Sequence, residues 1–214
     1  MENSLGAARA AIAGRFGIEC DVMLSRDRVP IVFHDTTLER LTMASGRVSD
    51  WAWEELSLLA LGNTKGQIPS ARQFLTLIGG QVPVVMELKG TSPREDEDFL
   101  ERLMPVISRY KGPLALMSFD PWLIDQAIAA GGFPVGLTAE GNRPEAFEAH
   151  REVFSRGCSF VSYNVQHLPN PFVEWVRTEQ GAPAITWTVR TLEDLIATRT
   201  HADQMTFEGF VPQG

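Results

Sequence analysis

The chain of 214 residues has 27 acidic and 19 basic side chains, and its formal net charge of −8 argues against nucleic acid or an anionic membrane surface as a partner. Two cysteines are too few for a disulfide scaffold, and no apolar run reaches the roughly 18 residues that a membrane span needs. Because the N-terminus also lacks the basic-then-apolar order of a signal peptide, we expect a cytoplasmic protein without a membrane span.

The N-terminal part predicts one helix followed by a β-hairpin. Residues 4–16 have one apolar face, and Ser4 is a suitable N-cap for a helix there. Residues 18–23 and 29–33 are strand-like and are joined by a short polar turn, which is typical of a hairpin.

Residues 36–80 predict an insertion after this hairpin. They contain an apolar group that we expect to form a small cluster, namely Trp51, Trp53, Leu56, Leu58 and Leu61. Pro69 is placed to open a helix at the end of the insertion.

From residue 82 the chain alternates strand-like and helical stretches. The predicted strands are 82–88, 114–119, 134–138, 160–164, 184–189 and 203–207. The predicted helices are 93–110, 121–130, 143–156, 170–179 and 191–199. Such an alternation predicts parallel strands with crossover helices in one domain over residues 1–214. If residues 29–33 are set aside as the hairpin partner, the predicted strands of a barrel number seven. The chain begins with a helix that should follow a strand, so the missing strand is the first one. An open nucleotide-binding sheet is the second choice, but no Gly-x-Gly-x-x-Gly follows a strand.

Charged side chains interrupt two of the predicted strands. Glu19 and Asp21 are two residues apart, so they share one face of a strand, as do Glu87 and Lys89 at the end of another. Paired carboxylates favour a divalent cation, and a nearby lysine suits a phosphate oxygen. His34, directly after the hairpin strand, is a candidate general acid or base. The alternatives are a solvated strand edge, a snorkelling lysine and an ordinary histidine.

Several segments together resemble the glycerophosphodiester phosphodiesterase family. In chain order they are Glu2-Asn3-Ser4, Ile18-Glu19-Cys20-Asp21-Val22, Val32-Phe33-His34-Asp35, Ile68-Pro69-Ser70, Glu87-Leu88-Lys89, Ser118-Phe119-Asp120 and Trp187-Thr188-Val189. The resemblance implies a (β/α)₈ TIM-type barrel of the phospholipase C-like phosphodiesterase class. It also implies metal-dependent hydrolysis of a small-molecule glycerophosphodiester to glycerol 3-phosphate and an alcohol.

The resemblance assigns roles to the matching residues. It implies one divalent cation, Mg²⁺ or Ca²⁺, bound by Glu19, Asp21 and Glu87. Lys89 would contact the phosphate, and His34 would be one of two catalytic histidines.

Substrate contacts are expected from Trp187 and from Glu2, which opens the matched N-terminal segment. The family's first strand with its His-Arg-Gly has no counterpart here, because Met1 directly precedes Glu2. A start at an internal methionine and a natural truncation both agree with this.

The missing segment leaves two alternatives for the function open. One is a catalytically impaired barrel that binds metal or phosphodiesters, and the other is a phosphodiesterase that forms a cyclic phosphate product. A homo-oligomer in which another chain covers the resulting gap is a further expectation.

Overall fold

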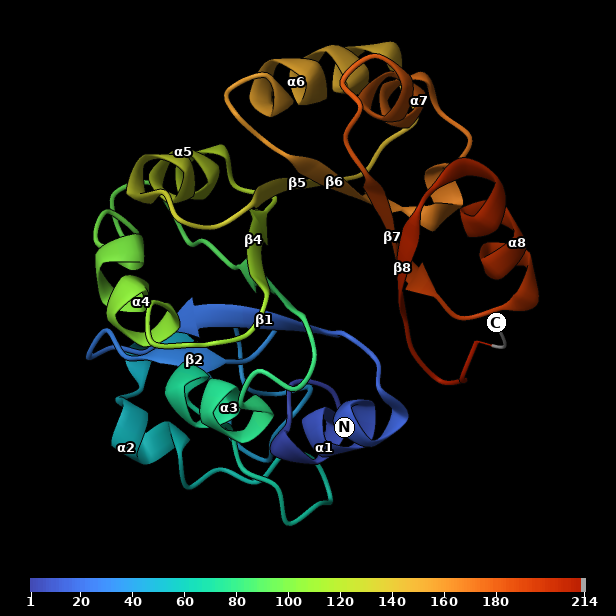
Figure 1. The fold of residues 1–214 in the computed structure, drawn as a ribbon. Coiled ribbons are helices and arrows are strands. Elements are labelled where there is room, and N and C mark those ends of the chain that lie inside the picture. The colour runs from blue at the N-terminus through green and yellow to red at the C-terminus, as the bar shows by residue number, and fades with distance from the viewer. Residues whose placement is uncertain (213–214) are drawn as a thin grey trace. The chain divides into compact units, whose positions relative to one another are not determined.

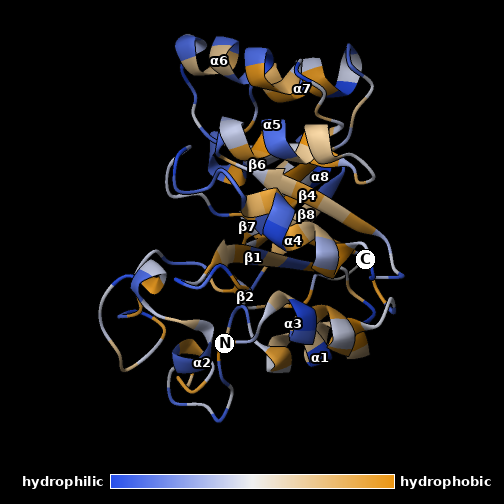
Figure 2. Cartoon of the chain, turned by 90° about the vertical axis from the view of Figure 1, so that its left-hand side faces the viewer, coloured by the Kyte–Doolittle hydropathy of each residue, from blue (hydrophilic) through white to orange (hydrophobic). Residues whose placement is uncertain are grey.

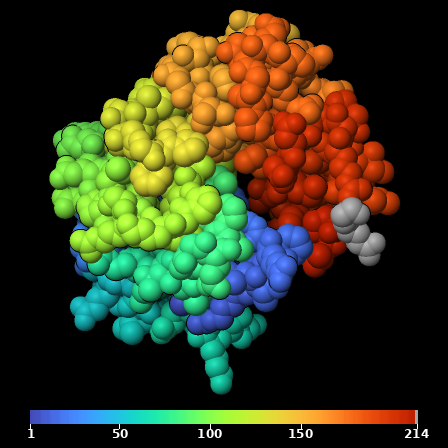
Figure 3. Space-filling view, in the orientation of Figure 1, coloured from blue at the N-terminus to red at the C-terminus, as the bar shows by residue number. Residues whose placement is uncertain are grey.

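The computed structural model describes residues 1–212, which divide into two compact units between Leu116 and Met117. The first unit runs from blue to green in Figure 3 and the second from yellow-green to red. The elements of the first unit are α1 (Leu5–Gly14), β1 (Ile18–Leu24), β2 (Pro30–Val32), η1 (Val48–Asp50), α2 (Trp53–Leu56), α3 (Ala71–Ile78), β3 (Val84–Leu88) and α4 (Phe99–Ile107). Strand β4 (Leu114–Ser118) runs through the division.

The first helix begins as the sequence predicts and ends earlier. Ser4 caps α1, because its Oγ accepts a hydrogen bond from Ala7 N at 3.0 Å. The helix ends at Arg15, whose φ of 59° turns the backbone into the left-handed conformation typical of helix C-termini. The expected continuation to residue 16 is therefore wrong.

The predicted hairpin is confirmed, and it joins a parallel pair. Strand β2 runs antiparallel to β1, with Val22 opposite Val32. On its other side β1 pairs in parallel with β3, and this register places Asp21 directly opposite Glu87. In Figure 1 β1 and β2 lie side by side above α3 and α1. The pairing of β1 with β3 therefore brings charged residues from two distant segments to one place.

The insertion between β2 and β3 has its own apolar cluster. Its buried members are Met23, Ile31, Phe33, Leu38, Leu41, Val48, Leu56, Leu61 and Ile68. Trp51 and Trp53 pack against them, as predicted. Leu58 does not, since it is 72% exposed, so its predicted place in the cluster is wrong. It lies just beyond α2, after the helical turn that buries Leu56.

The second unit is a run of parallel strands, each preceded by a helix. Its elements are α5 (Pro121–Ala130), β5 (Val135–Ala139), α6 (Pro144–Phe154), β6 (Phe160–Asn164), η2 (Val165–His167), α7 (Pro171–Thr178), β7 (Ala184–Val189), α8 (Leu192–His201) and β8 (Gln204–Phe207). The neighbours β5–β6, β6–β7 and β7–β8 are all parallel. Figure 2 shows both hydrophilic and hydrophobic residues on α6 and α7, as expected for helices with one buried face. The predicted strand–helix alternation is confirmed.

Candidate active site

Three carboxylates of the first unit converge at the β1–β3 pair. Glu19, Asp21 and Glu87 each offer a carboxylate oxygen, and these oxygens lie within 4.8 Å of one another. The convergence follows from local structure, because alternation places Glu19 and Asp21 on one face of β1 and the parallel register places Glu87 beside Asp21. The three residues predicted as metal ligands are thus brought together.

The electrostatics of this group favour a cation. Burial, followed by the charges of Asp21 and Glu87, raises the pKa of Glu19 well above its ordinary value. Burial also raises the pKa of Glu87. The Oε1 atom of Glu19 is buried and accepts no hydrogen bond from the described residues. A buried carboxylate without a donor is costly, and a divalent cation with oxygen ligands removes that cost, so these residues fit a metal ion.

Lys89 supplies a positive charge beside two of the three acids. Its Nζ lies 3.1 Å from Asp21 Oδ1 and makes a second, closer ion pair with Glu87 Oε1. Burial disfavours the ammonium form, but Asp21 and Glu87 outweigh it and raise the pKa of Lys89. Lys89 therefore stays charged at the edge of the cluster, where an anionic phosphate can meet it.

His34 lies next to Lys89 and is oriented by its neighbour in the chain. Its Nδ1 is 2.7 Å from Asp35 Oδ1, and its Nε2 is 3.4 Å from Lys89 Nζ. A carboxylate only accepts and an ammonium only donates, so these contacts suit a neutral imidazole with its proton on Nδ1. Nε2 is then the basic ring nitrogen, and its lone pair faces Lys89 Nζ.

Arg40 connects this histidine to the N-terminus, and sequence reasoning missed it. Its guanidinium donates to both oxygens of Asp35 at 2.6 Å. It also donates to both oxygens of Glu2, at 2.7 and 3.1 Å. The hydrogen bonds from Arg40 lower the pKa of Asp35 to about 2. Since Arg40 occupies both oxygens of Glu2, the predicted contact of Glu2 with substrate would require Glu2 to share or release this partner.

Asn3 is a second residue that sequence reasoning missed. Its Nδ2 donates to Asp21 Oδ2 at 2.7 Å, and its Oδ1 accepts from Asp21 N at 3.0 Å. This pair of bonds fixes the Asp21 carboxylate against the start of α1. The only available signal was the position of Asn3 in the matched Glu-Asn-Ser segment.

Trp187, predicted to contact substrate, belongs to the second unit. It is half-buried on β7, and its ring meets that of Phe119 edge to face, with 5.5 Å between the centroids. Its indole Nε1 is buried and donates to no described residue. The other three histidines, His150, His167 and His201, also lie in the second unit, so His34 is the first unit's single histidine.

The chain matches a family model and several known proteins. The model described as the glycerophosphoryl diester phosphodiesterase family matches residues 1–207. A glycerophosphodiester phosphodiesterase of Caldanaerobacter subterraneus is 36% identical over 91% of this chain and 82% of its own length. The putative glycerophosphodiester phosphodiesterase YhdW of Bacillus subtilis is 34% identical, but over only 42% of this chain and 40% of that protein.

Solved structures show the same fold. An Oleispira antarctica phosphodiesterase, determined in complex with the product sn-glycerol-3-phosphate, aligns with a TM-score of 0.83 at 21% identity, over 96% of this chain and 86% of its own. A glycerophosphodiester phosphodiesterase from Thermotoga maritima aligns with a TM-score of 0.77 at 24% identity, over 97% and 88%. These alignments confirm the predicted α/β barrel class. Within the described residues, every helix is too short or too polar to cross a bilayer.

Proposed function

This chain belongs to the glycerophosphoryl diester phosphodiesterase family, and we propose that it hydrolyses glycerophosphodiesters to glycerol 3-phosphate and an alcohol. The observation that carries the proposal is the convergence of Glu19, Asp21 and Glu87 to within 4.8 Å, with Lys89 at their edge. A carboxylate cluster beside a fixed ammonium suits the binding of a metal ion and a phosphodiester together.

The cofactor in this proposal is one divalent cation, Mg²⁺ or Ca²⁺, held by Glu19, Asp21 and Glu87. Both ions prefer oxygen ligands of this kind. When bound, such an ion polarises a phosphoryl oxygen and offsets its charge. The Oε1 of Glu19 is buried and accepts no hydrogen bond from the described residues, so a bound cation would give it a partner.

The chain's own residues would bind the substrate and move the proton. Lys89 offsets charge on a phosphoryl oxygen, and its contacts with Asp21 and Glu87 hold it in place. The Nε2 of His34 accepts or delivers a proton at the reacting oxygens, while Asp35 keeps the imidazole oriented. We assign substrate contacts to Trp187 and, once Arg40 releases it, to Glu2.

The single histidine of the first unit favours a second candidate, a chain that binds metal and phosphodiesters with little turnover. A site with one proton-transfer group in place of two is slower by about 10²- to 10⁴-fold. Such a chain would still bind the metal ion through its three carboxylates.

One assay separates the two candidates. Glycerol 3-phosphate release from glycerophosphocholine is measured with Mg²⁺, with Ca²⁺ and with EDTA, for the wild type and for Glu87→Gln. We expect metal-dependent release that falls by about 100-fold or more in the variant, because a metal ligand is lost. If the folded wild type shows no metal-dependent release of glycerol 3-phosphate, the second candidate, a chain that binds metal and phosphodiesters, is supported. A cyclic phosphate in the ³¹P spectrum of the products would instead identify a phosphodiesterase that forms a cyclic phosphate product.

Two further assignments belong to this proposal. A cytoplasmic location agrees with the two free cysteines, Cys20 and Cys158. A second copy of the chain as partner is tested by the solution mass.

A further inference from the structure

A cavity of about 280 Å³ lies beside the carboxylate cluster within the first unit. Its walls come from the turn between β1 and β2, from residues 47–50 and from the loop after β3. Lys89 is one of its lining residues and is also the ion-pair partner of Asp21 and Glu87. One substrate molecule can therefore place its phosphate at Lys89 and another of its chemical groups in this cavity, which we call the Lys89 cavity.

Arg47 presents an unengaged cation to this cavity. A short antiparallel ladder holds its backbone, since Leu38 N donates to Gly46 O and Val48 N donates to Thr36 O, each at 3.0 Å. The ladder begins directly after His34 and Asp35, so Arg47 is tied to the segment that carries the candidate catalytic histidine. Its side chain is exposed, and no described residue makes a hydrogen bond or ion pair with its guanidinium.

Arg28 presents a second cation from a backbone position that favours glycine. Its φ of 64° lies in the left-handed region, which is unfavourable for a residue with a side chain. Arg28 lines the cavity, and its guanidinium is ion-paired with Asp98, which is not a lining residue. A strained residue whose charge is fixed at a cavity wall indicates a role for that charge in binding.

The other charges of the wall are mixed. Arg26 lines the cavity and is ion-paired with Glu55, which is not a lining residue. Three carboxylates also line it: Asp50 and Glu95, which are exposed, and the buried Asp96, which accepts from the backbone N–H groups of Thr91 and Ser92 at 2.6 and 3.0 Å. With Lys89 the wall therefore has four cationic and three anionic side chains, although the whole chain is acidic.

We infer that the Lys89 cavity binds an anionic group carried by the alcohol part of the substrate, with Arg47 and Arg28 as its hydrogen-bond donors. This inference rests on the proposed function. A guanidinium recognises a carboxylate or phosphate through two parallel N–H donors, whereas a choline group offers no acceptor. The nearby Asp50 and Glu95 additionally suit an alcohol that carries an ammonium as well as an anionic group.

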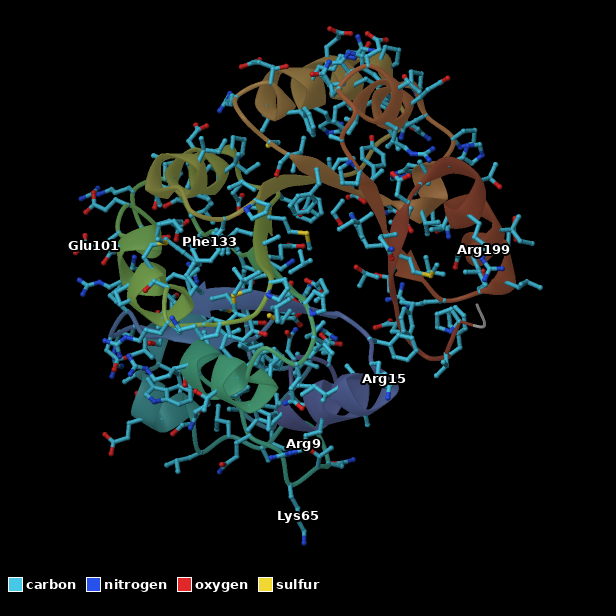
Figure 4. All side chains as sticks on the ribbon, in the orientation of Figure 1. Arg9, Arg15, Lys65, Glu101, Phe133 and Arg199 are labelled. Atoms are coloured by element: carbon cyan, nitrogen blue, oxygen red, sulfur yellow. The ribbon has the colours of Figure 1, made fainter. Side chains whose placement is uncertain are left out.

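Two substrates that differ by one carboxylate isolate the predicted contact. Glycerophosphoserine is glycerophosphoethanolamine with a carboxylate added to the alcohol part. We measure kcat/KM for both with metal, and Kd for both by calorimetry in EDTA, for the wild type, Arg47→Gln, Arg28→Gly and the double variant. Arg9→Gln is the control, since Arg9 is an exposed arginine of α1 outside the cavity wall (Figure 4).

The wild type is expected to favour glycerophosphoserine by about tenfold, the effect of a hydrogen bond to a charged group. Each single variant should reduce that preference several-fold and the double variant should abolish it, while Arg9→Gln keeps it. Arg28→Gly also tests whether a fold defect is responsible, because glycine suits the backbone there. Turnover of both substrates without a preference in kcat/KM or Kd overturns the inference and leaves the proposed function intact. Absence of all turnover overturns the proposed function, and the Kd ratio still decides the role of the cavity.

Discussion

Glu19 differs from the other two carboxylates of the cluster in its immediate surroundings. Lys89 contacts Asp21 and Glu87, and Asn3 also donates to Asp21. Glu19 has no such donor at its buried Oε1. The cluster is therefore asymmetric, and the residue with the least compensation is the one whose ionisation costs most in the absence of a cation.

This asymmetry predicts a pH-dependent stability in EDTA. Because the pKa of Glu19 is raised, first by burial and then by Asp21 and Glu87, the folded chain keeps a proton that the unfolded chain releases. The free energy of unfolding then falls as pH rises from the ordinary pKa of glutamic acid towards the raised one. We predict that Glu19→Gln removes this contribution, so that the variant gains stability relative to the wild type between pH 5 and pH 8 in urea unfolding. Parallel pH profiles for the two proteins would contradict this origin, and Mg²⁺ or Ca²⁺ at pH 8 should stabilise the wild type more than the variant.

Arg40 is expected to act on the reaction through Asp35 and His34. It donates to both oxygens of Asp35, which in turn holds His34 Nδ1. Small displacements of a catalytic group cost up to about 100-fold in rate. We therefore predict that Arg40→Gln lowers kcat by about tenfold or more with a smaller change in KM, and that Arg40→Lys recovers part of the loss. A change confined to KM would indicate instead that Arg40 binds substrate.

The sequence predicted site residues that lie on regular strands or just after them, and it missed those held by contacts between distant segments. Alternation along β1 and the end of β3 indicated Glu19, Asp21, Glu87 and Lys89. The contact of Asn3 with Asp21 spans 18 residues and that of Arg40 with Glu2 spans 38. Neither contact produces a periodic pattern, so only the folded chain reveals it.

At the scale of elements, the insertion cluster shows how far apolar composition predicts burial. Four of the five expected members pack in or against the cluster, which also contains Phe33 and Ile31. Leu58 is apolar but lies beyond the single turn of α2 and is exposed, although Leu59 packs against the cluster and Leu61 is buried in it. Burial of a residue just past a short helix depends on the loop path, which composition does not specify.

Leu56 and Leu58 therefore form a matched pair of substitutions. Leu56 is fully buried and Leu58 is 72% exposed, although both are leucines of the same segment. We predict that Leu56→Ala lowers the free energy of unfolding by about 2–5 kcal/mol through the loss of buried contacts and the cavity left behind. Leu58→Ala should change it by less than about 0.5 kcal/mol, as surface substitutions do. Similar losses for both variants in urea unfolding would show that Leu58 is covered in solution.

Across the whole molecule, the order of strands and helices was predictable because each strand–helix unit carries its own periodic pattern. The hairpin, the insertion and the alternation after residue 82 all have the predicted order. The ends of elements were less predictable: α1 ends before residue 16 because Arg15 adopts a left-handed conformation there. Such an ending is usual for glycine, so an arginine gave no signal of it.

The expectation of one domain over residues 1–214 leads to a prediction about cooperativity. Strand β4 includes residues from both compact units, and its central residues Leu116 and Met117 are both buried. Neither unit can unfold its share of β4 without breaking a continuous strand and exposing apolar side chains, which opposes separate unfolding.

We predict the outcome of native-state hydrogen exchange, measured by mass spectrometry at increasing urea concentrations. Peptides from β3 and from β6 should reach the same limiting free energy of opening. Peptides from the exposed loop around Lys65 serve as the control, since they should exchange through local opening at every urea concentration. Two distinct limiting free energies would mean that the chain behaves as two domains. In that case a substitution such as Leu56→Ala would weaken protection only in the unit that contains it, whereas a single cooperative chain loses protection in both.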